Sequence, residues 1–110
     1  MKLPNPDRAV VDIAKLRDYC LNPRHPRGRN KARVFAAVLG ITAEKADLLR
    51  DALLQAALQS EAIPSEQDAH GQRYVVDFDL VGPSGRGTVR SSWMVRTGEE
   101  APRLTSCYVL

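Results

Sequence analysis

The residues best suited to chemistry lie in one basic segment, NPRHPRGRNKARVF, which runs from Asn22 to Phe35. His25 lies in it between an arginine and a proline. The segment contains no acidic residue and five cations: Arg24, Arg27, Arg29, Lys31 and Arg33. Cations bind phosphate oxygens, and histidine exchanges protons readily near neutral pH. The segment therefore predicts an anion-binding surface with one side chain suited to acid–base chemistry.

The position of these cations, at the start of a predicted helix, favours a ligand over a purely structural role. Positive charges at a helix N-terminus oppose the helix dipole, at a cost of roughly a few tenths of a kcal/mol each. An anion bound there would relieve this conflict, because exposed backbone N–H groups also favour phosphate. Two alternatives stay open: a solvated basic helix start, and a surface histidine without a chemical role.

Three helices are expected in the first sixty or so residues. The segment 12–21 has apolar residues at helical spacing and begins with Asp12, a good N-cap. The segment 28–40 follows a proline-rich break, and the segment 43–59 follows Thr42, which can cap it. The second helix carries an apolar stripe that is expected to face the core: Ala32, Phe35, Ala36 and Leu39.

The second half of the chain changes to the alternating pattern of strands. Pro64–Gly71 reads as a polar loop, and strands are expected after Gln72. Trp93 falls on the apolar face of the middle strand and is expected to be buried. The strands are expected in three segments joined by turns: residues 73–82, 87–96 and 103–110.

These elements predict one α+β domain over residues 1–110. About three N-terminal helices, over about residues 8–60, are expected to pack on one face of a C-terminal antiparallel β-meander. The meander has three or four strands and covers about residues 72–110. At 44% hydrophobic and 26% charged residues, the composition is that of a globular domain and not of a disordered chain.

The chain shows no apolar run long enough to span a membrane and no secretory signal, so a cytoplasmic protein is expected. Cys20 and Cys107 are therefore expected to be reduced, buried residues and not a disulfide. No motif for a cofactor or metal is present, and none is expected. Asp77 and Asp79 lie on one strand face. Two interpretations are open: the pair binds a divalent ion, or it serves solubility, which is the usual role of two carboxylates on a solvent face.

The motif HPRGRNKARVF, preceded by YCLNP, resembles a known pattern of toxin domains. Further along the chain follow GQRY, a GPSG turn, a tryptophan-bearing strand and a terminal RLTSCY. This order is similar to the small nuclease domains of bacterial polymorphic and contact-dependent inhibition toxins, in the barnase–EndoU–colicin–RelE ribonuclease group. It is also similar to a family of small uncharacterised bacterial proteins with the same pattern. The resemblance spans Lys15 to Tyr108.

The resemblance implies a metal-independent ribonuclease toxin, a hydrolase in which the ribose 2′-OH attacks the adjacent phosphate. His25 would then be the base or the acid, and Lys31 would hold the phosphate. Ser106 and Tyr108 match the polar pair of the last strand in the family, where Thr-x-Tyr is usual. Tyr108 also shares its predicted strand face with Leu104, so a core-lining role is the alternative. Further contacts to RNA are expected from Arg27, Arg29, Arg33, Arg90 and Thr105.

The expected partners are RNA, with tRNA among the candidates, and a small acidic cognate inhibitor that covers the basic surface. His70 is the one other histidine and a candidate second proton carrier. Two alternatives to the enzyme remain at this point. The chain is either a nucleic-acid-binding module without catalysis or an interaction protein of a toxin system with a basic binding face.

Overall fold

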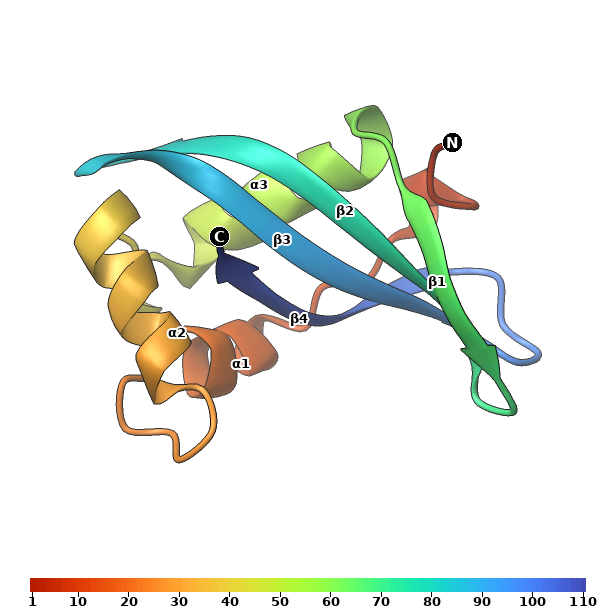
Figure 1. The fold of residues 1–110 in the computed structure, drawn as a ribbon, viewed down its shortest axis with the longest axis horizontal. Helices are drawn as coiled ribbons and strands as arrows, with labels where there is room; N and C mark the ends of the chain where they lie inside the picture. Colours follow the sequence, from red (N-terminus) through yellow and green to blue (C-terminus); the bar gives the residue numbers. More distant parts are fainter.

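The computed structural model describes residues 1–110, with helices in the first half of the chain and strands in the second (Figure 1). This order confirms the predicted α+β fold. The helical part comprises η1 (Pro6–Arg8), α1 (Ile13–Lys15), η2 (Leu16–Cys20), α2 (Arg29–Val34), η3 (Phe35–Leu39), η4 (Ala43–Lys45) and α3 (Ala46–Gln59). The strands are β1 (Ile63–Asp68), β2 (Gly71–Gly82), β3 (Gly85–Arg96) and β4 (Pro102–Val109).

The ends of the helices follow local sequence signals. Asp12 caps α1 as predicted, because its carboxylate accepts the N–H of Ala14 at 2.9 Å. Both α1 and α2 continue into π-helical turns, η2 and η3. The second of these ends at Gly40, whose φ of 70° lies in the left-handed region that glycine adopts without strain. Thr42 stands before η4 but forms no side-chain capping bond.

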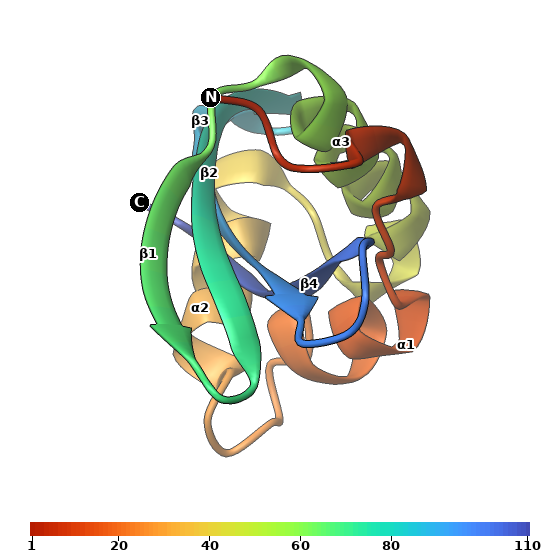
Figure 2. The same cartoon turned by 90° about the vertical axis from the view of Figure 1, so that its right-hand side faces the viewer.

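The four strands form one antiparallel sheet in the order β1-β2-β3-β4. The long strands β2 and β3 form its central hairpin, which turns at Gly82–Gly85 as predicted. The helices lie on one side of this twisted sheet (Figures 1 and 2). The N-terminal segment covers part of the edge of β4, since Val10 donates to the carbonyl of Pro102 at 2.9 Å and accepts from Leu104 at 3.0 Å.

The prediction of a polar loop at Pro64–Gly71 is wrong, because most of this segment belongs to β1. β1 pairs with β2 in register from Ile63 opposite Val75 to Asp68 opposite Gly71, with an irregularity after Pro64. Every residue of β1 is exposed, so neither face shows the alternation that marks a half-buried strand. Pro64 is compatible with the strand because β1 lies at the edge of the sheet.

The hydrophobic core lies between the sheet and the helices. Trp93 is fully buried, which confirms the prediction for the middle strand. Val76 and Val89 on the same sheet face meet Leu49 and Leu53 of α3 in one cluster of buried side chains. Burial of this apolar surface is what holds the helices to the sheet.

A register shift in β4 changes which of its residues face the core. Trp93 pairs with Leu104 but the preceding residue, Ser92, pairs with Ser106, so Thr105 is an extra residue in a β-bulge. Leu104 is buried, whereas Ser106 and Tyr108 beyond the bulge are only half-buried. The alternative of a core-lining Tyr108 on the face of Leu104 is therefore wrong. The bulge moves Tyr108 to the outer face.

Ser91 is the one buried polar side chain, and it supports Trp93. Its hydroxyl donates to the carbonyl of Val76 at 2.7 Å and accepts the indole N–H of Trp93 at 2.9 Å. Replacing Ser91 by alanine leaves the indole N–H buried without a partner, so we expect the free energy of unfolding to fall by about 1–3 kcal/mol. Urea unfolding followed by tryptophan fluorescence measures the change. Ser92→Ala, on the opposite face, is the matched control and should have little effect.

Candidate anion-binding site

Lys31 and Tyr108 meet where the first turn of α2 approaches the last residues of β4. The ammonium of Lys31 lies 4.6 Å from the centre of the Tyr108 ring. A cation over an aromatic face at this distance gains about 0.5–1 kcal/mol at an exposed site. Two of the predicted site residues, 77 positions apart in the chain, are thus in contact.

A polar row crosses three strands on the outer face of the sheet and ends at Tyr108. Arg90 of β3 pairs with Asp77 of β2 on one side and with Tyr108 of β4 on the other. Its guanidinium donates to both carboxylate oxygens of Asp77, at 2.9 and 2.8 Å. These bonds lower the pKa of Asp77 below its ordinary value. The pKa of Arg90 is raised, first by Asp77 and then by the Tyr108 hydroxyl.

Tyr108 thus has a guanidinium, held by Asp77, on the neighbouring strand and the ammonium of Lys31 over its ring. Asp77 was not among the predicted site residues, because its position in the strand pattern does not distinguish it from Asp79. Asp79 accepts instead from the hydroxyl of Thr88 at 2.9 Å. No group of three or more histidine, cysteine or acidic residues is arranged to hold a metal ion.

His25 caps the loop that leads into α2. Its Nδ1 accepts the backbone N–H groups of Arg27 and Gly28, each at 3.1 Å. Its ring meets Tyr19 edge-on, with the centroids 4.6 Å apart. Because Nδ1 is an acceptor, the neutral imidazole carries its proton on Nε2. As placed, His25 is a hydrogen-bond donor through Nε2, and no hydrogen bond or ring contact joins it to Lys31.

The hydroxyl residues of β4 have different surroundings. Thr105, in the bulge, donates to the carbonyl of Ser92 at 3.1 Å, and its own carbonyl accepts from Lys15 at 3.3 Å. Thr105 therefore stabilises the bulge. Ser106 pairs across the sheet with Ser92, next to the pair of Arg90 and Tyr108. Two serines thus extend the polar row on the outer face.

His70 is not placed to join these residues. It lies in the turn between β1 and β2, at the opposite end of the sheet from α2 (Figure 1). Its backbone N–H donates to Asp68 at 2.9 Å. The hypothesis of His70 as a second proton carrier therefore has no geometric support.

The basic segment carries positive charge that the chain itself does not neutralise. All five of its cations are exposed, and none forms an ion pair with a carboxylate. Most cations elsewhere do so, as Arg8 does with Glu100 and Arg103 with Glu99. Arg27, Arg29 and Arg33 are thus available to a ligand, whereas Arg90 is engaged by Asp77.

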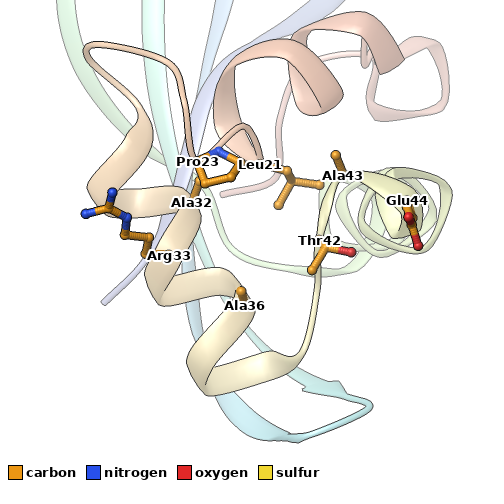
Figure 3. A pocket seen from close by; sticks show the side chains of 8 residues that line it. All are labelled: Leu21, Pro23, Ala32, Arg33, Ala36, Thr42, Ala43 and Glu44. Atoms are coloured by element: carbon orange, nitrogen blue, oxygen red, sulfur yellow. The ribbon is translucent and has the colours of Figure 1, made fainter.

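A pocket of about 420 Å³ lies beside the basic segment, between α2 and the start of η4 (Figure 3). Arg33 and Glu44 flank it on opposite sides. Small and apolar side chains form most of its wall: Leu21, Pro23, Ala32, Ala36, Thr42 and Ala43. Ala36 was expected in the core with Phe35, but it is exposed and lines this pocket instead. The apolar stripe of the second helix is therefore shared between the core and the surface.

None of the helices is both long and apolar enough to cross a membrane. This agrees with the absence of an apolar run in the sequence.

Known proteins share the fold of this chain, but none of them shows its activity. The structure is similar to one chain of a solved structure described as "Contact-dependent growth inhibition toxin - immunity protein complex from Klebsiella pneumoniae 342", with a TM-score of 0.73 and 18% identity. The match covers 92% of this chain and 99% of that chain. A family model described as "Domain of unknown function (DUF6883)" matches residues 2–110. No curated protein matches the sequence.

Proposed function

The chain belongs to the DUF6883 family, a family of unknown function. We propose that it is one member of a toxin system and that its basic surface binds an acidic partner protein. The observation that carries this proposal is the basic segment, with five exposed cations and no carboxylate in ion-pair contact. Such a surface is costly in an isolated protein, because the like charges repel one another. An acidic partner offsets that repulsion and gains fast association.

The fold supports the toxin-system part of this proposal. The similar solved structure is described as a toxin–immunity protein complex, so a chain of this fold takes part in such a pairing there. The pocket beside Arg33 supports the protein-partner part. Its apolar wall fits one inserted apolar side chain, while the neighbouring arginines of the basic segment fit acidic residues around that anchor.

The direct test is co-expression of the chain with the product of a neighbouring small acidic reading frame, followed by purification of the complex and calorimetry. We expect a stable complex whose affinity falls as salt is raised, since exposed charges are screened. A failure to form a complex, or binding that does not respond to salt, would contradict the proposal.

A second candidate function is metal-independent RNA cleavage, and the contact of Lys31 with Tyr108 favours it. Lys31, whose ammonium lies over the tyrosine ring, can neutralise phosphate charge beside Tyr108. In this proposal the 2′-OH attacks the adjacent phosphate and gives its proton to water, the 5′-oxygen leaves and takes up a proton from water, and a cyclic phosphate forms. His25 would serve as the donor through Nε2, with Tyr108 and Ser106 as polar contacts to the phosphate.

The two candidate functions are compatible, because an inhibitor that covers the basic segment would also block RNA. They differ in one measurement. Purified protein, free of any partner, should cut RNA in the presence of EDTA if the second function holds, and a substrate with a 2′-deoxy sugar at the cut should resist. If RNA stays intact under all conditions, partner binding is the one candidate function that remains.

A further inference from the structure

The two cysteines lie together in the core, although the sequence separates them widely. Cys20 is the last residue of η2, and Cys107 lies in β4 next to Tyr108. Both are free thiols, with only 3% and 2% of their surface exposed, and both belong to the same buried cluster. The chain holds no other cysteine. Because η2 packs directly against β4, the fold brings both thiols into the same layer of the core, between the helices and the edge strand.

Their surroundings give the two thiols different reactivity. The pKa of Cys20 is lowered to about 7, mainly by a hydrogen bond from the Cys107 thiol and also by the Cys107 backbone and the positive charges of Lys15 and Lys31, against the opposing effect of burial. The same hydrogen bond, together with burial, raises the pKa of Cys107 well above its ordinary value. Cys20 is thus the thiol that ionises more readily and is the better nucleophile, and Cys107 is the neighbour that stays protonated.

We propose that Cys20 and Cys107 form an oxidative modification site, in which a hydroperoxide converts the adjacent thiols into a disulfide that joins η2 to β4. This inference does not depend on the proposed function. A small oxidant is the fitting class, because the thiols are almost closed to solvent and a bulky disulfide reagent has little access.

The reaction proceeds in two balanced steps. In the first step the Cys20 thiolate attacks one peroxide oxygen and the O–O bond breaks, which leaves a sulfenic acid on Cys20. The other peroxide oxygen leaves as an alkoxide or hydroxide and takes up a proton from water. The Cys107 sulfur then attacks the sulfur of the sulfenic acid, its proton leaves with the hydroxyl group as water, and the S–S bond forms. With hydrogen peroxide, two thiols and one peroxide give one disulfide and two waters. A thiol reductant reverses the modification.

The disulfide would fix the position of the candidate site. Cys107 is adjacent to Tyr108, and Lys31 lies both near Cys20 and over the Tyr108 ring. The bond would also close a long loop of the unfolded chain, which reduces its entropy and stabilises the folded state.

The test is treatment of the native, fully reduced protein with hydrogen peroxide at neutral pH. We expect loss of both free thiols and a mass lower by about 2 Da. On a non-reducing gel the protein should remain a monomer and run slightly faster than the reduced protein, because the disulfide makes the denatured chain more compact. The oxidised protein should melt at least about 10 °C higher than the reduced protein. The rate of thiol loss should rise with pH around a midpoint near 7, following ionisation of Cys20.

Two single variants separate the roles of the thiols. Cys107→Ser keeps a hydrogen-bond donor beside Cys20 and should stop at a sulfenic acid on Cys20, detected as a mass gain of about 16 Da. Cys20→Ala should react at least about tenfold more slowly and show no such gain. Circular dichroism checks that each variant is folded. If a variant fails to fold, the wild-type protein alone decides the question. The proposal would be overturned if the wild type forms no disulfide under native conditions, forms one only in denaturant, or forms cross-linked dimers.

Discussion

Replacing His25 by alanine is expected to lower RNA cleavage by about 10²–10³-fold, the usual effect of removing a hydrogen-bond donor to charge that develops in the transition state. Binding of RNA should be nearly unchanged, because the phosphate contacts come from the cations of the basic segment. Cleavage of a fluorescent oligoribonucleotide in EDTA, at substrate concentrations below and above saturation, measures both quantities. The product should end in a cyclic phosphate.

The structure adds a control to this experiment. His25 also holds the loop before α2, by accepting the N–H groups of Arg27 and Gly28. Alanine removes this cap as well as the imidazole, so loss of activity alone is ambiguous. His25→Asn offers a side-chain oxygen to the same N–H groups but lacks the Nε2–H donor. We expect asparagine to restore the melting temperature and not the cleavage.

Each outcome of this pair of variants has a distinct meaning. Full cleavage by His25→Asn would show that the histidine acts only as a cap of the loop. Intact RNA with the wild-type protein, with and without Mg²⁺, together with harmless expression in cells, would end the ribonuclease hypothesis. The proposal of an acidic partner would be unaffected, because it depends on charge and not on His25.

Lys31 should behave differently from His25 in the same assay. Its ammonium lies over the Tyr108 ring, where it can hold the phosphate in both the ground state and the transition state. Lys31→Gln is therefore expected to weaken RNA binding and cleavage together, whereas His25→Asn reduces cleavage alone.

Local patterns in the sequence were sufficient for most elements of the fold. The cap at Asp12, the turn at Gly82–Gly85 and the buried Trp93 each depend on neighbouring residues or on simple alternation. β1 could not be predicted in this way, since an exposed edge strand is held by its pairing with β2 and not by an apolar face. Its polar residues are the same ones that a loop would carry.

The candidate site depends on tertiary structure to a greater degree. Alternation along β4 placed Tyr108 on the face of Leu104, and only the bulge at Thr105 moves it to the outer face. The contact of Tyr108 with Lys31 further requires α2 to pack beside β4. The pairing of Arg90 with Asp77 requires the register of the central hairpin. Motif resemblance suggested Lys31 and Tyr108, but the geometry that joins them was not readable from spacing.

Neutralising the basic segment should have the largest effect on partner binding. The variant replaces four exposed arginines by glutamine: Arg24, Arg27, Arg29 and Arg33. We expect affinity for the acidic partner to fall by at least about 10³-fold at ~50 mM salt, mostly through slower association and the loss of several charge contacts. The difference from wild type should shrink as salt is raised, because screening weakens the wild-type contacts and leaves the variant little changed.

A matched control removes the same net charge from cations that already have a carboxylate partner. It replaces four ion-paired arginines by glutamine: Arg8, Arg50, Arg96 and Arg103. We expect at most a few-fold loss of affinity, because these charges are compensated within the chain. The basic-segment variant should also be as stable as wild type or slightly more stable, since Arg29 and Arg33 lose their mutual repulsion at the start of α2. Equal loss of affinity in both variants would show that net charge alone drives binding, and the assignment of the interface to the basic segment would then be wrong.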